Sequence, residues 1–391
     1  MIEHVYLDNS ATTPVAPEVL EAMLPYFRDE YGNPSSLHTP GQTARRAIDR
    51  AREEIAATLG ASPPEIVFTA GATEADNLAI KGLALAQPEK RHLITCQIEH
   101  PAVLRTCEWL AGQGYELTVL DVDATGRVDP EELRTALRED TLLVSIMAGN
   151  NEIGTLQPLE NLGEICRERG VPFHTDAVQA YGKVPLQLRA IDLLSASAHK
   201  LHGPKGVGFL YVRKGTALTP VLHGGGHERG RRSGTENTPG IVGFAKAATL
   251  ALQELTVTPE RMREFREGLI RVVTRIPATR LNGHPTESLP HIANFSFQGI
   301  EGESLIMRLD EQGIAASTGS ACSSPDLEPS HVLLAIGVPL SMAHGSLRIS
   351  TGRQTTQQDI DRLLAVLPQV VSELRAISPF KVGDASCTPT E

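Results

Sequence analysis

Two apolar runs of the sequence end in charged side chains that could act together on one ligand. Residues 171–176 end in Asp176, and residues 192–200 end in a histidine followed by Lys200. If both runs are neighbouring buried strands, an acid and an amine lie side by side at one edge of a sheet. A lysine there can form a Schiff base with pyridoxal phosphate (PLP), and the aspartate can keep the pyridine nitrogen protonated. Taken alone, Lys200 is more simply explained as a residue that ends a strand and points into water. The PLP interpretation therefore depends on the residues that accompany Lys200.

A phosphate site is predicted where a helix begins. Residues 71–73 (GAT) start a helix and offer free backbone N–H groups and a hydroxyl, which suit a phosphate. Ser197 and His199 flank the end of the strand before the lysine and could donate to the same phosphate. Small residues at a helix start usually only form the turn that precedes the helix, so these residues alone are weak evidence for a phosphate site.

Three more polar residues follow predicted strands, at the edge where open parallel sheets bind ligands. His100 lies between a strand and a helix, Asn151 follows the strand that ends near Met147, and Gln179 comes three residues after Asp176. The Gln179 amide could contact a ring hydroxyl. An isolated histidine at such a place is more often a surface or cap residue than a catalytic one.

Two loops have compositions that packing does not explain. Residues 224–235 are rich in glycine and arginine, which favours contact with a small anion, although a mobile surface loop is the simpler reading. Residues 317–325 place Cys322 among serine, threonine, glycine and alanine, where a thiol has no packing role and could act as a nucleophile. An inert solvent-facing cysteine explains this segment equally well. His223 and His227 have no third ligand at a suitable spacing, so no metal site is expected.

Alternating strand and helix patterns predict the elements that would bring these residues together. In residues 39–59, apolar side chains recur with the spacing of one helix face. Asp129, followed by a proline and two acids, marks another helix start. Such alternation favours a mostly parallel sheet covered by helices. The predicted strands include residues 65–69, 92–96, 116–120, 141–147 and 171–176, and the predicted helices include residues 39–59, 71–83 and 101–113.

The pattern changes near Glu260, which indicates a second, smaller domain. A charged helix is predicted over residues 261–274, followed by turns rich in glycine and proline. Residues 292–297 alternate between apolar and polar side chains, like a strand with one face in water. The residues after Lys381 are too polar and too small to pack.

Composition limits the classes of protein. With 391 residues, the chain is long enough for two domains. Its 41% hydrophobic and 21% charged residues are ordinary for a globular enzyme, and its net charge of −11 argues against a nucleic-acid surface. No signal peptide, presequence or membrane-spanning run is recognised, so no membrane contact is expected. The five cysteines are scattered without a Cys-x-x-Cys pair, which predicts a reducing, cytoplasmic compartment.

Taken together, these segments resemble the NifS/IscS-type cysteine desulfurases, which are PLP enzymes of fold type I in the class-V aminotransferase family. The matching motifs follow one another along nearly the whole chain: VYLDNSATTP (5–14), GNP (32–34), GATE (71–74), NNE (150–152), HTDAVQA (174–180), HK (199–200), RSGT (232–235), GSAC (319–322) and LEPS (327–330). PSSLH (34–38), HTDAVQA and HKLH (199–202) are more similar to the nitrogen-fixation (NifS) branch than to the housekeeping branch. Ala198 replaces a glycine found in many relatives, and Pro325 lies in the cysteine loop, but neither change removes a reactive group.

The resemblance implies an α/β fold with two domains. The large domain would contain a mostly parallel seven-stranded sheet between helices, and the smaller domain would be α+β. The large, PLP-binding domain is expected over residues 15–260. The small domain is expected to comprise residues 1–14 and 261–391 and to carry a mobile cysteine loop at about residues 317–330.

The resemblance also implies a role for each candidate residue. Lys200 would bind PLP as a Schiff base and then move protons, and Asp176 would hold the pyridine nitrogen. Catalysis would also need His100, stacked on the ring, and Cys322, which would take the sulfur of L-cysteine as a persulfide while alanine leaves. The expected cofactor site comprises Ala72, Thr73, His100, Asn151, Asp176, Gln179, Ser197, His199, Lys200 and Thr235, the last of which would reach the phosphate of a partner subunit.

Substrate and partners are implied in the same way. Arg348 would bind the carboxylate of L-cysteine through its two-pronged guanidinium, helped by Asn151. The family supplies sulfur to iron–sulfur scaffold proteins. A scaffold or another sulfur-acceptor protein is therefore the expected partner of a cytoplasmic homodimer.

Several alternatives stay open at this point. Lys205, in a Gly-Pro-Lys-Gly turn, is a second candidate for the Schiff base, although it does not follow a strand. A selenocysteine lyase, an aminotransferase or another PLP enzyme of the same fold would explain most of the motifs, but an aminotransferase would not need Cys322. A non-catalytic sulfur carrier is a third interpretation, and the presence of Lys200, Asp176 and His100 argues against it.

Overall fold

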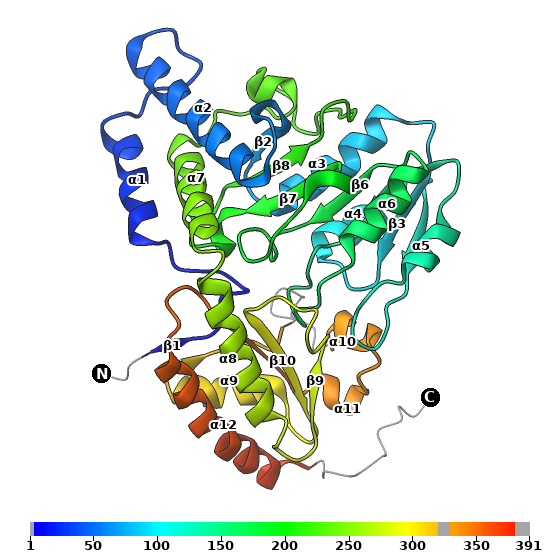
Figure 1. Cartoon of the computed structure of the whole chain (residues 1–391), viewed down its shortest axis with the longest axis vertical. Coiled ribbons are helices and arrows are strands. Elements are labelled where there is room, and N and C mark those ends of the chain that lie inside the picture. Colours follow the sequence, from blue (N-terminus) through cyan, green and yellow to red (C-terminus); the bar gives the residue numbers. More distant parts are fainter. Residues whose placement is uncertain (1–3, 320–328, 380–391) are drawn as a thin grey trace.

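A seven-stranded sheet forms the centre of the larger domain in the computed structural model, which describes residues 4–319 and 329–379 (Figure 1). Its strands are β2 (Ile66–Thr69), β3 (His92–Cys96), β4 (Glu116–Leu120), β5 (Thr141–Ser145), β6 (Phe173–Asp176), β7 (Leu193–Ser197) and β8 (Gly208–Val212). Their order is β2-β8-β7-β6-β5-β3-β4, and every neighbouring pair from β7 to β4 is parallel. β8 runs antiparallel to both of its neighbours. The predicted mostly parallel sheet of seven strands is confirmed.

Helices cover both faces of this sheet, and the strand residues are divided between them. In β7, Leu193 packs with α3 (Ala72–Ala86) and α4 (Pro101–Ala111). Leu194 and Ala196 pack on the opposite face with α2 (Thr39–Leu59) and α7 (Thr238–Gln253). This division follows from the two-residue repeat of a strand. The remaining helices of this domain are α1 (Pro17–Arg28), α5 (Pro130–Ala136) and α6 (Leu159–Glu168).

Local signals located several helix ends closely. Helix α2 ends at Leu59 as predicted, and Gly60 follows it in the left-handed conformation that commonly terminates helices. Helix α5 begins directly after Asp129, whose side chain accepts the backbone N–H of Glu131 at 2.9 Å. Helix α4 stops at Ala111, two residues short of the predicted end.

The smaller domain combines an antiparallel sheet with helices and has its own hydrophobic core. Its elements are β1 (Val5–Tyr6), α8 (Thr258–Val273), β9 (Thr279–Asn282), β10 (Ile292–Phe297), α9 (Gly302–Glu311), β11 (Ile314–Ala315), α10 (His331–Ala335), α11 (Leu340–Ala343), β12 (Ser346–Ser350) and α12 (Gln357–Ile377). The sheet order is β12-β10-β9, and β1 pairs in parallel with β11. The second core draws on Val5, Leu7 and residues between 265 and 374. The exact boundaries stay a prediction.

Strand β10 differs from the prediction of a strand with one face in water. All six of its residues are buried. Phe295 and Phe297 pack in the core of the smaller domain. The polar Asn294 and Ser296 are buried as well, and the Asn294 amide donates to the backbone oxygen of Glu152 in the larger domain. The predicted exposure is wrong because the larger domain covers the polar face.

The glycine-rich basic loop is attached to the larger domain through its charged residues. Glu228 is buried and accepts hydrogen bonds from both terminal nitrogens of Arg52, at 2.6 and 2.7 Å. It also accepts the backbone N–H of Phe68 at 2.8 Å. Further along the loop, Arg232 pairs with Glu74 at 2.8 Å. A purely mobile surface loop does not account for these contacts.

Replacing Glu228 with alanine should destabilise the fold because it leaves the Arg52 guanidinium buried without its carboxylate. The two side chains are only 4% and 2% exposed. Removing one partner of a buried ion pair costs about 3–5 kcal/mol, which urea unfolding followed by circular dichroism would measure. The double variant Arg52→Met/Glu228→Leu is the control and should recover most of the loss. A loss below about 1 kcal/mol, as for a surface pair, would contradict this assignment.

Candidate active site

A cavity of about 890 Å³ opens at the carboxyl-terminal edge of the main sheet, beside the smaller domain. Its wall includes the ends of β6 and β7, the start of α3, residues 10–12 and one arginine of β12. Among the residues predicted for the cofactor and the substrate, it brings together Ala72, Thr73, His100, Asn151, Asp176, Gln179, Ser197, His199, Lys200 and Arg348.

The predicted pairing of an acid with an amine rests on two adjacent parallel strands, β6 and β7. Asp176 lies opposite Ser195 in the register, and the short 3₁₀ turn η3 (Ala198–Lys200) carries the lysine just past the end of β7. Asp176 is buried and accepts the backbone N–H of Val178 at 2.9 Å. Burial raises the pKa of Asp176, and the positive charge of Lys200 opposes this rise. The acid and the amine therefore share one electrostatic environment.

The N-terminal segment orients Lys200 in the cavity. The Lys200 Nζ donates to the carbonyl oxygens of Ser10 and Ala11, at 2.5 and 2.8 Å. The Gln179 amide donates to the same Ser10 oxygen at 2.9 Å. The alternative lysine, Lys205, also lines the cavity but is exposed. The position of Lys200 beside the buried acid favours it over Lys205 as the residue that would hold a cofactor.

His100 both caps a helix and lines the cavity. Its Nδ1 accepts the backbone N–H of Ala102 at 3.1 Å, at the start of α4. Burial lowers the pKa of His100, so the ring is neutral near pH 7. Because Nδ1 accepts a hydrogen bond, the proton of the neutral ring lies on Nε2. The ring is therefore available to the cavity as a neutral group with one N–H donor.

The start of α3 is suited to hold a phosphate. Its N-cap, Gly71, provides no side chain to satisfy the backbone N–H groups of the first turn. Ser197 and Thr73 line the cavity there. The His199 Nδ1 lies 3.1 Å from the Thr12 hydroxyl, and burial lowers the pKa of His199 to about 4. His199 would therefore contribute a hydrogen bond rather than a charge.

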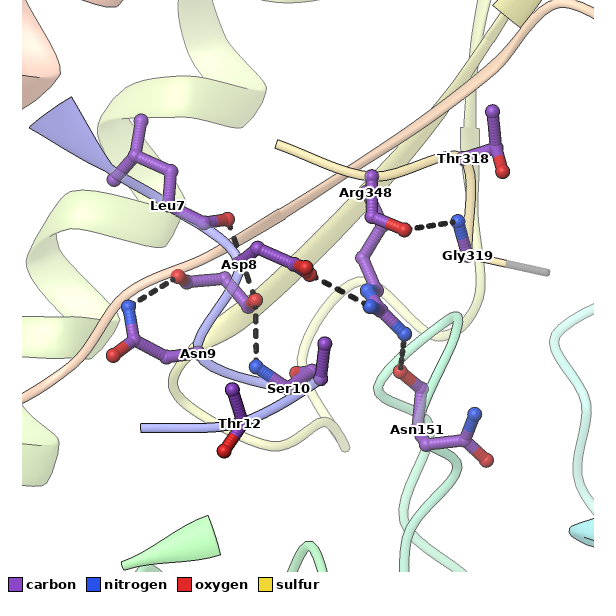
Figure 2. A network of polar contacts seen from close by, with 12 residues as sticks. Leu7, Asp8, Asn9, Ser10, Thr12, Asn151, Thr318, Gly319 and Arg348 are labelled. Atoms are coloured by element: carbon purple, nitrogen blue, oxygen red, sulfur yellow. Dashed lines mark hydrogen bonds and ion pairs between the residues drawn. The ribbon is translucent and has the colours of Figure 1, made fainter. Parts of the chain in front are cut away.

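Arg348 projects from β12 toward the cavity and is held between two partners (Figure 2). Its Nη2 donates to the Asp8 carboxylate at 2.8 Å, and its Nη1 donates to the Asn151 carbonyl oxygen at 3.0 Å. The buried Nε has no hydrogen-bond partner among the described residues. The guanidinium is thus already oriented, and a substrate carboxylate would share it with Asp8.

Two of the predicted site residues are not placed at this cavity. Thr235 is exposed and does not line the cavity of the single chain, so its predicted role requires a second copy of the chain. Cys322, with most of its predicted mobile loop, lies outside the described residues. Gly319, the last residue described before it, lines the cavity. Within the described part of the chain, no group of acidic, histidine or cysteine side chains could hold a metal ion.

Sequence reasoning missed several residues of this site. Ser10 and Ala11 act through backbone carbonyls, which no side-chain pattern reveals. Asp8 belongs to an N-terminal motif, but nothing in its spacing links it to an arginine 340 residues away. Asp76 and Glu99 are buried acids, and Asp76 lines the cavity. For Asp76 a signal existed, because an acid lies on the otherwise apolar inner face of α3.

Comparison with known families agrees with this geometry. Residues 5–363 match the family described as Aminotransferase class-V. The chain belongs to this family. Its members that resemble the chain include the cysteine desulfurases, and the expected PLP cofactor is confirmed by the family assignment. The residues at the cavity fit PLP. A helix start without a capping side chain would bind the phosphate, and a buried acid would bind the ring nitrogen. A lysine that lines the cavity would bond to the aldehyde carbon.

Individual relatives match over almost the whole chain. The chain is 56% identical to the cysteine desulfurase IscS of Methanosarcina thermophila over 379 residues. This matched region covers 96% of this chain and 94% of the relative. The solved structure of a NifS-like protein superposes with a TM-score of 0.90 at 42% identity, covering 95% of this chain and 100% of the other. A solved structure described as SspA in complex with cysteine superposes with a TM-score of 0.79 at 39% identity. The match covers 90% of this chain and 99% of the other. The predicted resemblance and fold class are confirmed.

His174 should make the protein less stable in acid. It is fully buried on β6 between the hydroxyls of Ser145 and Ser195, at 2.8 and 3.0 Å, and burial lowers its pKa to about 3. The unfolded chain takes up this proton below about pH 6.5, whereas the folded chain does not until about pH 3. The free energy of unfolding therefore falls as the pH drops through this window.

The variant His174→Gln tests this pH dependence. It should lose less stability between pH 7 and pH 5 than the wild type, because it has no ring to titrate. Urea unfolding at the two pH values measures the difference, whatever the absolute stability of the variant. An equal or larger loss in the variant would show that His174 is not held neutral.

Proposed function

We propose that this chain is a PLP-dependent cysteine desulfurase, which converts L-cysteine to L-alanine and passes the sulfur to Cys322 as a persulfide. The observation that carries the proposal is the cavity in which Asp176, Lys200 and Arg348 meet. In the transfer, the C–S bond of cysteine breaks, the Cys322 sulfur bonds to the released sulfur, and the carbon gains a proton. The 56% identity to a cysteine desulfurase favours this activity over a selenocysteine lyase.

Different residues around the cavity would bind different parts of the cofactor. PLP, when bound, supplies an electron sink that weakens bonds of the attached amino acid. Asp176 would hold the proton-bearing ring nitrogen, since it is the carboxylate beside the lysine. The first turn of α3, with Thr73 and Ser197, would bind the phosphate, helped by His199. Gln179 would contact the ring hydroxyl.

Substrate binding and proton movement would involve the opposite wall. Arg348 and Asn151 would hold the substrate carboxylate, since the arginine already points into the cavity and has an unused Nε donor. The Lys200 amine, once free, would move protons at the substrate carbon atoms, with the carbonyls of residues 10 and 11 to position it. His100 would lie on the ring and offer its Nε2 proton.

We infer that the enzyme works as a homodimer. Helix α1 exposes Leu20, Leu24 and Phe27 on one side, and Tyr31 follows, exposed by 77%. Single exposed apolar residues are ordinary, but a row of them on one helix is typical of a surface that another protein covers. In such a dimer, Thr235 would serve the phosphate site of the partner subunit. Sedimentation velocity at micromolar concentration tests this, and a monomer would contradict it.

The biological role follows from the persulfide. We propose that a sulfur-acceptor protein, such as an iron–sulfur scaffold, receives the sulfur in the cytoplasm, and that the NifS-like motifs reflect a role in nitrogen fixation. No helix within residues 4–319 and 329–379 is long and apolar enough to cross a membrane. Transfer of radioactive sulfur from cysteine to a purified scaffold tests the acceptor. Cell fractionation tests the compartment. No transfer, or a membrane-bound fraction, would contradict them.

Cys322→Ser should lower alanine and sulfide production from cysteine by about 100-fold or more, because no thiol remains to take the sulfur. Mass spectrometry after turnover should find the extra sulfur on Cys322 in the wild type and on no residue in the variant. Cys387→Ser is the matched control and should keep both activity and persulfide. Full activity in Cys322→Ser would contradict the proposed mechanism.

Lys200→Ala should lose covalently bound PLP, whereas Lys205→Ala should keep it. Only Lys200 lies beside the buried acid, while both lysines line the cavity. Reduction with borohydride followed by peptide mass mapping identifies the lysine that carries the cofactor, and the visible absorption of the purified variants gives a second measure. Cofactor on Lys205 in the wild type would overturn the choice of Lys200.

A further inference from the structure

His291 is a buried histidine to which the proposed function gives no role. It directly precedes β10 in the smaller domain, and its backbone oxygen accepts the N–H of Thr351, the residue after β12, at 2.9 Å. Its ring lies beside Gln179, with 3.2 Å between the His291 Nε2 and the Gln179 Oε1. Gln179 lines the cavity. A side chain of the smaller domain is therefore in contact with a residue of the proposed cofactor site.

The Gln179 amide has one chemically allowed orientation. Its side chain is buried, and its Nε2 donates to the carbonyl oxygen of Ser10 at 2.9 Å. A carbonyl oxygen can only accept a hydrogen bond, so the atom beside it must be the amide nitrogen. Turning the amide over would bring two oxygens into contact. The amide oxygen therefore faces His291.

This orientation determines which nitrogen of His291 carries the proton. An amide oxygen has no hydrogen, so the His291 Nε2 must be the donor of the bond to Gln179. Burial lowers the pKa of His291 well below its usual value, and the charges of Lys183 and Arg348 lower it further, so the ring is neutral. The buried Nδ1 has no partner among the described residues. Within this part of the chain, the ring makes one hydrogen bond, and it goes to Gln179.

Both partners of the amide are attached to the same end of the smaller domain's sheet. The backbone N–H of Ser10 donates to the Ser350 hydroxyl, at the end of β12, at 2.9 Å. His291 precedes Ile292, which lies opposite Ser350 in the pairing of β10 with β12. The Ser10 oxygen also accepts the Lys200 Nζ at 2.5 Å. The orientation of the amide therefore depends on two adjacent strand ends of the smaller domain.

The amide nitrogen of Gln179 still has a hydrogen to offer. An amide Nε2 carries two hydrogens, and among the described residues one of them has a partner, the Ser10 oxygen. The second can donate to a ligand in the cavity that Gln179 lines. The ring hydroxyl of PLP is a phenol, whose oxygen is a strong acceptor once it has lost its proton. An amide nitrogen facing this oxygen attracts it, whereas an amide oxygen would repel it.

We propose that His291 is a positioning residue for the cofactor, which holds the Gln179 oxygen so that the amide nitrogen faces the ring hydroxyl. The inference rests on the proposed function, in which Gln179 contacts this hydroxyl. His291 bonds to the end of the amide that does not contact the cofactor, so it acts through Gln179 and is not catalytic. Cofactor binding in the larger domain then depends on a side chain of the smaller one.

Two amide substitutions at His291 place a donor at the correct end of the ring or at the wrong end. His291→Gln puts its NH₂ group close to the position of Nε2 and keeps the bond. His291→Asn is one bond shorter, so its NH₂ group lies near Nδ1 and does not reach Gln179. The dissociation constant of PLP should stay within about twofold of the wild type in His291→Gln. It should rise by about tenfold in His291→Asn, because the buried Gln179 oxygen loses its donor and the amide can turn.

A double-mutant cycle separates positioning of the amide from general support of the fold. Gln179→Leu removes the amide that His291 would position. In this background, His291→Asn should change the dissociation constant of PLP by less than about twofold, compared with about tenfold in the wild-type background. Titration of each apoprotein with PLP, followed by visible absorption, measures all four proteins. An equal loss in both backgrounds would show that His291 does not act through Gln179 and would overturn the proposal.

The remaining outcomes are equally decisive. Unchanged affinity in His291→Asn, or a loss in His291→Gln as large as in His291→Asn, would overturn the proposal, since the donor at Nε2 would then not matter. His291→Phe is a second variant without a donor and should show the same tenfold loss. Failure of both His291→Asn and His291→Phe to fold, seen by circular dichroism, would assign His291 to the fold and also overturn it. Failure of the wild-type apoprotein to bind PLP would instead refute the proposed function.

Discussion

The parallel pairing of β6 with β7 is the constraint on which the whole site depends. Its register places Asp176 beside Ser195 and carries Lys200 just past the end of the neighbouring strand. On its other side, β7 pairs with β8, so the strand is fixed along both edges. A shift of one residue in β6 would turn Asp176 to the opposite face of the sheet, among the apolar side chains that contact α2 and α7.

Burial at this edge sets the charges that the site carries. The same loss of water raises the pKa of the Glu99 acid and lowers the pKa of the His174 base, because in both groups it disfavours the charged form. Both of these buried groups are therefore mostly neutral at pH 7. Arg348, by contrast, is paired with the Asp8 carboxylate at 2.8 Å.

The site is completed where the two domains meet. The N-terminal segment leaves β1 in the smaller domain and then supplies the carbonyls that bind Lys200 in the larger one. Arg348 belongs to β12 of the smaller domain, but its carbonyl partner, Asn151, follows β5. The polar face of β10 is buried at the same junction through Asn294. The residues proposed to bind the cofactor and the substrate are thus held by one interface, so their geometry depends on how the domains pack.

The sequence by itself determined most of the elements and the kind of chemistry. Periodic apolar residues located α2, because burial of one helix face imposes a local repeat, and the ordered motifs indicated the family and a role for Lys200. It did not determine which polar groups touch. Only the tertiary structure decided that Asp8 holds Arg348 and that Asp76 and Glu99 are buried. These contacts join residues far apart in the chain, and the protonation of a carboxyl group depends on what surrounds it, which no local pattern encodes.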